Sequence, residues 1–221
     1  MDLLQAIQER HSVRAYTGQK IETEKRQKLD ALVKECNEES GLHIQIRYDD
    51  PSGFDSTLAR YGKFRNVKNY LILAGKPSND LQERCGYYGE KIVLEAQRMG
   101  LNTCWVALSF NKSAVKKLIP AGEKMVLVIA IGYGQTQGTA HKSRPLERIV
   151  DTKAETPDWF RKGVEAALLA PTAINQQKFK IELKDGEPVI RIAGMGPYTK
   201  IDLGIVKYHF EVASGHKTRH T

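Results

Sequence analysis

Long hydrophobic runs are absent from this sequence. The longest uninterrupted apolar run, residues 125–131, has seven residues, far fewer than the roughly 20 that a membrane-spanning helix needs. The first residues also lack the basic and apolar regions of a signal peptide. We therefore expect a cytoplasmic protein without a membrane partner.

Cysteine is scarce. The three cysteines, Cys36, Cys85 and Cys104, lie far apart, and no CxxC pair or Cys/His cluster has the spacing of a metal site. We therefore predict no bound metal. An odd number of cysteines in a cytosolic chain indicates reduced thiols.

Several functional signatures are missing as well. Lysine and arginine outnumber the acidic residues by 34 to 26, for a net charge of +8, but the charges are scattered. No basic run, zinc-finger, RNP or GXXG signature favours nucleic acid. No Gly-x-Ser-x-Gly elbow and no Gly-x-Gly-x-x-Gly after a strand occurs. A basic nucleic-acid-binding module therefore stays only a less favoured alternative.

What is present is an alternation of helical and extended patterns over 221 residues, a length typical of one globular domain. We expect a single domain, residues 1–221, with two candidate half-units at about 1–155 and 156–221. Because a hairpin follows the alternating part, the expected architecture is a mixed sheet covered by helices. The predicted helices span residues 22–39, 79–99, 111–118, 156–170 and 201–213, and the predicted strands span 43–48, 69–74, 102–110, 124–133, 179–183 and 189–192.

Local signals set several boundaries. Asn111 is a candidate helix cap, and Thr156 has the same role before Pro157. Residues 49–62 are rich in Asp, Ser and Gly and indicate a loop. Asp202 and His209 lie two turns apart on the final helix. They form either a catalytic pair or, as the more economical interpretation, surface groups on a packing helix.

A cationic motif follows a short amphipathic helix at the N-terminus. The β-branched Val13 and the aromatic Tyr16 favour an extended chain, in which alternate residues share one side. Arg10, Ser12 and Arg14 would then point the same way. Two guanidinium groups flanking a hydroxyl suit a phosphate. The alternative is a solvated basic edge.

Three stretches in order resemble the flavin-dependent nitroreductase family. They are residues 9–14, residues 95–107 with the strand that ends at 131–134, and residues 141–147. The resemblance covers about residues 1–150. A fourth stretch, residues 168–179, resembles the family's Ala-Pro-Ser-x-x-Asn-x-Gln segment. That segment usually follows the arginine motif closely, whereas here it comes more than 150 residues later. The sequence is similar to a nitroreductase subgroup with a rearranged motif order.

This resemblance implies an α+β fold: a nitroreductase-like mixed, largely antiparallel β-sheet sandwiched by α-helices. It also implies bound FMN. The expected phosphate contacts are Arg10, Ser12, Arg14, Lys142 and Arg144, with His11 either a further contact or a surface residue. The backbone at Trp105, Val106, Ala107 and Leu108 would lie near the reducible ring nitrogen, and the displaced segment would contribute Pro171, Thr172, Ala173, Asn175 and Gln176.

Structural alternatives exist for most of these residues. Trp105 can be a core aromatic, and Thr172, Asn175 and Gln176 can satisfy backbone groups in a turn after Pro171. Lys142 and Arg144 can be ordinary loop charges.

The implied activity is a ping-pong transfer from NAD(P)H through FMN to a nitroaromatic, quinone or similar small-molecule acceptor. The flavin carries the chemistry, so no catalytic side chain is assigned. The resemblance also implies a homodimer. A flavin-dependent reductive dehalogenase and a non-catalytic flavin-binding sensor or store remain alternatives.

Overall fold

The computed structural model describes residues 1–151 and 156–219. The chain divides into two compact units. Unit 1 comprises residues 1–9, 82–91 and 140–221, and unit 2 comprises residues 10–81 and 92–139. Both units are assembled from separate stretches of the chain. The half-units that meet near residue 155 stay a prediction. The single domain stays a prediction, and each unit is described below by itself.

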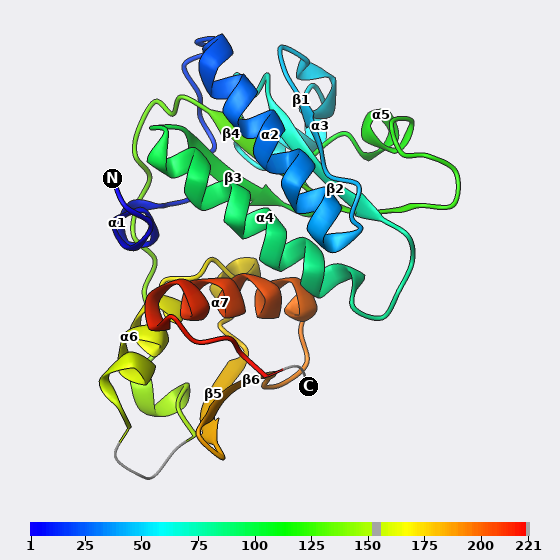
Figure 1. Ribbon diagram of the computed structural model, residues 1–221. Helices are drawn as coiled ribbons and strands as arrows, with labels where there is room; N and C mark the ends of the chain where they lie inside the picture. The colour runs from blue at the N-terminus through cyan, green and yellow to red at the C-terminus, as the bar shows by residue number, and fades with distance from the viewer. Residues whose placement is uncertain (152–155, 220–221) are drawn as a thin grey trace. The chain divides into compact units, whose positions relative to one another are not determined.

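Unit 2 is built on a four-stranded sheet with the order β1-β2-β4-β3, in which every neighbouring pair is antiparallel (Figure 1). The largely antiparallel sheet expected from the sequence is thereby confirmed. The central strands β2 and β4 are the most apolar, and β2 and the last six residues of β4 are buried throughout, as expected for strands paired on both sides. The strands are β1 (Gln45–Arg47), β2 (Tyr70–Gly75), β3 (Asn102–Val106) and β4 (Lys124–Gly132).

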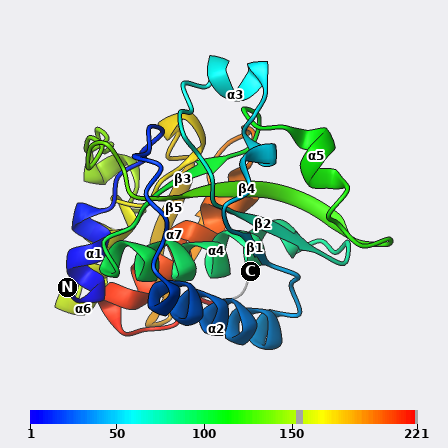
Figure 2. The same cartoon turned by 90° about the horizontal axis from the view of Figure 1, so that it is seen from above.

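The sheet of unit 2 has a core on each face. Tyr70, Val128 and Cys104 belong to one cluster with Phe54 and Phe64. Figure 2 shows α3 (Thr57–Tyr61) and α5 (Lys112–Lys116) on one side of the sheet and α2 (Thr23–Ser40) on the other. The alternation of side chains along each strand supplies both faces.

Unit 2 departs from the sequence prediction in two segments. Residues 49–62 are not a simple loop, because they contain the 3-10 helix η1 (Pro51–Gly53) and α3. The residues that suggested a loop act as caps: Asp50 accepts from the Ser52 N–H at 2.9 Å, and Ser56 Oγ accepts from the Ala59 N–H at 3.2 Å. Strand β3 also ends at Val106, since the chain bends before residue 110. The Asn111 cap is confirmed.

Unit 1 combines helices with a two-stranded hairpin. The hairpin turn is formed by Asp185 and Gly186, both with positive φ, as a two-residue turn requires. The predicted Thr156 cap is wrong, because Pro157 occupies the N-cap position and no side chain caps the helix. The elements of unit 1 are α1 (Leu3–Glu9), the first half of α4 (Leu81–Arg98), η2 (Leu146–Arg148), α6 (Asp158–Ala167), η3 (Ala173–Asn175), β5 (Phe179–Lys184), β6 (Glu187–Ile192) and α7 (Thr199–Ser214).

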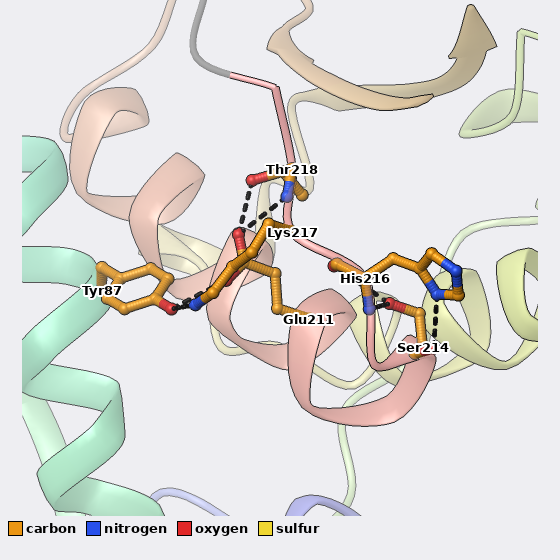
Figure 3. Close-up of polar contacts among 6 residues, drawn as sticks. All are labelled: Tyr87, Glu211, Ser214, His216, Lys217 and Thr218. Atoms are coloured by element: carbon orange, nitrogen blue, oxygen red, sulfur yellow. Dashed lines mark hydrogen bonds and ion pairs between the residues drawn. The ribbon is translucent and has the colours of Figure 1, made fainter. Parts of the chain in front are cut away.

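The segment after α7 is anchored by Glu211 (Figure 3). One Glu211 oxygen accepts from the Thr218 N–H at 3.0 Å and from its hydroxyl at 2.7 Å. The other accepts from Lys217 Nζ at 2.8 Å and from the Tyr87 hydroxyl at 2.7 Å. Burial alone would raise the pKa of this carboxyl, but these donors bring it below its usual value. The anchor is therefore ionised.

Within the described residues, no helix is both long and apolar enough to cross a membrane, and no group of three or more His, Cys, Asp or Glu side chains could hold a metal ion. The three cysteines are buried free thiols, as expected. Burial raises the pKa of Cys85 to about 12 and that of Cys104 above its usual value.

Helices α4 and α7 approach closely within unit 1, and glycines make this approach feasible. A Cβ on Gly204 would lie 2.0 Å from the Glu83 carbonyl oxygen and 2.6 Å from the Tyr87 nitrogen. A Cβ on Gly86 would lie 2.1 Å from the Ile201 carbonyl oxygen. Backbone atoms cannot move aside as a flexible side chain can, so this crossing excludes any larger residue.

The substitution Gly204→Ala should therefore lower the free energy of unfolding by about 2 kcal/mol or more. In an open helix the same exchange would raise it by about 1 kcal/mol, so the sign of the effect is diagnostic. Urea denaturation measures it, with Glu165→Ala on the exposed side of α6 as the control. A stabilised Gly204→Ala protein would contradict the close crossing.

Candidate functional site

In unit 2 the N-terminal cationic motif lies along β3. We call residues 10–16 the arginine segment. The Val13 N–H donates to the Thr103 carbonyl at 3.0 Å, and Ser12 and Thr103 form a parallel β-bridge. Further along, Arg65 donates to the Arg14 carbonyl and accepts from the Tyr16 N–H, both at 3.0 Å. These bonds hold the segment in the extended conformation that the sequence predicted.

The loop after β4 covers the other edge of the arginine segment. Asn102 Oδ1 accepts from the Gly134 N–H at 2.9 Å. A Cβ on Gly134 would lie 2.9 Å from the Val13 side chain, and one on Gly138 would lie 2.8 Å from the His11 Cβ. Gly138 has φ +77°, a conformation that favours glycine. Small residues therefore let the loop close over the segment.

Exposure alternates along the arginine segment. Val13 and Tyr16 are buried, whereas Ser12 and Arg14 are exposed. Ser12, Val13 and Arg14 follow the predicted alternation, but the segment departs from it at two residues. Arg10 is only 3% exposed and does not share the exposure of Ser12 and Arg14, and Tyr16, which an extended chain would place on their side, is 2% exposed. Arg10 directly follows helix α1, before the backbone begins its extended course. His11 is half-buried.

Cys104 lies beside the motif, and the sequence analysis assigned it no role there. Burial raises the pKa of its thiol, while the Arg14 charge, a hydrogen bond to Ser12 and the Arg10 charge act in the opposite direction. All three motif residues therefore lie close to one neutral sulfur. Because the thiol stays protonated at neutral pH, it does not neutralise the two arginines.

The predicted ring-contacting residues continue from the same strand. Trp105 pairs with Ile129 in the sheet and is half-buried, and Val106 is buried. Ala107 and Leu108 follow the end of β3, and Leu108 is 57% exposed. Since Thr103 holds Val13, unit 2 brings the arginine segment beside β3, the strand that leads to these residues.

Unit 1 joins two other predicted motifs. We call residues 141–145 the basic loop and residues 171–177 the proline segment. Gln177 Nε2 donates to the Lys142 carbonyl at 3.0 Å, and Gln177 Oε1 accepts from the Arg144 N–H at 2.7 Å. Asn175 Nδ2 also donates to the Lys142 carbonyl at 3.0 Å. The side chains of Lys142 and Arg144 remain exposed. No local pattern in the sequence indicated Gln177, which connects the two motifs.

The proline segment carries unusual backbone angles. Ile174, Asn175 and Gln177 all have positive φ, between 45° and 55°. For a β-branched residue this conformation is a genuine outlier, and the Ile174 side chain is 88% exposed. Strain of this kind persists only where surrounding contacts enforce it, and it concentrates at functional sites.

Asp202 of α7 holds the proline segment in place through hydrogen bonds. It accepts from the Ala173 N–H at 2.9 Å and from Gln176 Nε2 at 2.7 Å. Thr172 Oγ1 accepts from the Gln177 N–H at 3.0 Å. Thr172, Asn175 and Gln176 therefore do satisfy polar groups around this turn. Burial raises the pKa of Asp202 to about 6, against the effect of Gln176 and Ala173.

Asp202 and His209 do not form a pair. The buried His209 contacts Glu90 through Nε2 at 2.9 Å, and its Nδ1 lies 3.1 Å from the Ala166 carbonyl oxygen. The expectation of surface polar groups on this helix is wrong for both residues, because α7 is buried on several sides.

The titration of Asp202 predicts a pH-dependent stability difference. Because its pKa in the folded protein lies above its ordinary value of 3.8, the carboxyl stabilises the fold fully below about pH 4, and this contribution is lost as the pH rises through about 6. Asp202→Asn cannot titrate. Its free energy of unfolding, relative to the unaltered protein, should therefore rise between pH 4 and pH 7, by up to about 3 kcal/mol.

Chemical denaturation across this pH range measures the difference. Asp185→Asn, at the exposed hairpin turn, is the matched control and should show no such trend. If the free energy of unfolding of Asp202→Asn, relative to the unaltered protein, falls as the pH rises, the raised pKa of Asp202 is contradicted.

Comparisons with known proteins identify one family. Residues 2–214 match the sequence model of the family described as "Putative TM nitroreductase". A solved structure described as a "putative nitroreductase" from Thermotoga maritima MSB8 is 25% identical, with a TM-score of 0.70 over 96% of this chain and 83% of that one. No curated protein matches the sequence significantly.

Two more distant structures share the fold. A nitroreductase from Desulfovibrio desulfuricans in complex with FMN is 22% identical, with a TM-score of 0.56 over 71% of this chain and 99% of that one. An FMN-dependent nitroreductase from Clostridium difficile R20291 is 16% identical, with a TM-score of 0.51 over 62% of this chain and 90% of that one. The family match spans nearly the whole chain, and this protein therefore belongs to the nitroreductase family, with the fold of its solved members.

Proposed function

We propose that the protein is an FMN-dependent oxidoreductase that transfers reducing equivalents from NAD(P)H to a small acceptor such as a nitroaromatic or a quinone. Membership of the nitroreductase family supports this class of reaction. The observation that carries the proposal is the arginine segment, which holds the Ser12 hydroxyl and the Arg14 guanidinium exposed on a backbone fixed to β3.

The donors of the arginine segment fit the phosphate of FMN. A phosphate dianion accepts several charge-assisted hydrogen bonds, and a guanidinium fork matches two of its oxygens. Ser12 adds a neutral donor, and the Arg10 charge lies close by. We assign His11 a supporting contact. Since the Cys104 thiol is neutral, it would not compete with the phosphate for these donors.

The proline segment and the basic loop of unit 1 are the second part of the proposal. Lys142 and Arg144 would add cations for the phosphate, and Gln177 holds the backbone of their loop on both sides of Ser143. The partly exposed residues of the proline segment would contact FMN through its turn; these are Pro171, Thr172, Ala173 and Asn175. Gln176 is buried and acts as a positioning residue through Asp202.

When bound, FMN would supply the redox chemistry by accepting a hydride from the donor and passing reducing equivalents to the acceptor. The chain would bind the ring and orient it. The backbone from Trp105 to Leu108 would donate toward the ring edge where charge develops on reduction. No side chain is required as an acid or base. We also propose that two copies of the chain assemble as a homodimer.

The visible absorption spectrum of the purified protein tests the proposal directly. With added FMN, bands near about 370 and 450 nm should appear, as expected for oxidised flavin, and they should bleach when NADH or NADPH is added. The same sample with the donor omitted is the control. Bands that do not bleach would favour a flavin-binding sensor or store. A colourless protein in excess FMN would refute the proposal.

Arg14→Ala should weaken FMN binding, because it removes the exposed guanidinium of the arginine segment. We expect the dissociation constant to rise about tenfold or more, the effect of losing one strong charge-assisted contact. Fluorescence titration of FMN measures the change. Arg161→Ala, an exposed arginine on α6, is the control for loss of charge. Equal flavin affinity in the two variants would remove Arg14 from the site.

A further inference from the structure

Unit 2 contains a second basic feature, a pocket of about 540 Å³ beside the arginine segment. We call it the Arg65 pocket. Its volume falls within the range typical of small-molecule sites and exceeds what a single phosphate occupies. Its lining includes Phe54, Phe64, Arg65, Asn66, Val67 and Lys68.

The charges around the Arg65 pocket are unbalanced. Arg60, Arg65 and Lys68 face a single lining acid, Asp55, which lies 3.7 Å from Arg60. Among the described residues, neither Arg65 nor Lys68 has an ion-pair partner. The imbalance favours an anionic ligand.

The nearest acids of the sequence do not correct this imbalance, because they are already paired. Asp49 binds Arg26 at 2.8 Å, and Asp50 contacts Arg47 at 3.3 Å. These two acids therefore do not pair with Arg65 or Lys68, and both cations can bind a ligand.

The polar side of the pocket is held in place by one carbonyl. Asn66 Nδ2 and Gln135 Nε2 each donate to the Tyr16 carbonyl at 3.2 Å. Each of these primary amides has a second N–H group, which could donate a hydrogen bond to a phosphate oxygen. Asn66 has φ 56°, so the turn that carries Arg65 and Lys68 is a specific conformation.

The other side of the pocket is apolar. Phe54, Phe64 and Val67 are each at least nine-tenths buried and form a firm wall. The Arg14 guanidinium lies 6.0 Å from the centre of the Phe64 ring, so the pocket and the arginine segment share this side chain. Cations opposite an aromatic wall suit a ligand that carries phosphates on a flat, partly apolar body.

We propose that the Arg65 pocket binds the adenosine diphosphate portion of the nicotinamide donor, with its phosphates at Arg65 and Lys68 and its adenine at the phenylalanine wall. Only the identity of the donor rests on the proposed function. The pocket adjoins the arginine segment, but none of its lining residues is among the contacts assigned to FMN.

The test is calorimetric titration of the flavin-loaded protein with ADP and, separately, with inorganic pyrophosphate. We compare the double variant Arg65→Gln/Lys68→Gln with Lys20→Gln/Lys76→Gln, which changes the net charge equally at exposed positions outside the pocket. The pocket variant should bind ADP about tenfold more weakly, and the control should change by less than about threefold. Arg65→Gln alone should give a smaller loss in the same direction.

Pyrophosphate should bind several-fold more weakly than ADP, because it lacks the adenine that contacts the wall. Equal binding of the two probes would overturn the nucleotide assignment. Equal ADP affinity in the two double variants, or no ADP binding by the unaltered protein, would overturn the pocket. Loss of flavin absorbance in the pocket variant would assign these residues to FMN instead.

The steady-state readout separates this proposal from the proposed function. In an active enzyme the pocket variant should raise the KM for the donor. If the unaltered protein shows no flavin reduction, the proposed function fails. The ADP titration then still decides the pocket, because it requires no turnover.

Discussion

The hydrogen bond from the Val13 N–H to the Thr103 carbonyl is the contact on which the candidate site of unit 2 depends. It attaches the arginine segment to the edge of β3 and fixes which side chains turn inward. Val13 enters the core, so its neighbours Ser12 and Arg14 must face outward. A shift of one residue would bury the cation and expose Val13. The loop after β4 secures this register through Asn102.

In unit 1, a side-chain amide fixes the backbone that carries the exposed cations. Gln177 contacts both the Lys142 carbonyl and the Arg144 N–H, so one buried residue determines the course of a loop more than 30 positions earlier. The same segment holds Ile174 in a conformation that costs free energy. Asp202 and Thr172 offset that cost by satisfying its backbone donors. Both units thus present exposed cations on backbones held by buried polar contacts.

Local patterns in the sequence were sufficient for most of the secondary structure. The apolar runs predicted β2 and β4, Asn111 predicted a helix start, and the residues around Gly186 predicted the hairpin turn. The failure at residues 49–62 has a local cause. Asp50 and Ser56 suggested a loop because short polar residues serve equally as turn residues and as helix caps.

The sequence by itself determined the alternation of buried and exposed residues, the turn chemistry and the ordered motifs that indicated the family, because these depend on near neighbours and residue type. Only the tertiary structure decided that Arg10 is buried, that His209 pairs with Glu90 rather than Asp202, and that Gln177 links the basic loop to the proline segment. Each of these depends on which distant chain segment supplies the partner. A buried polar group takes whatever donor or acceptor the packed fold places beside it, and no local pattern specifies that neighbour.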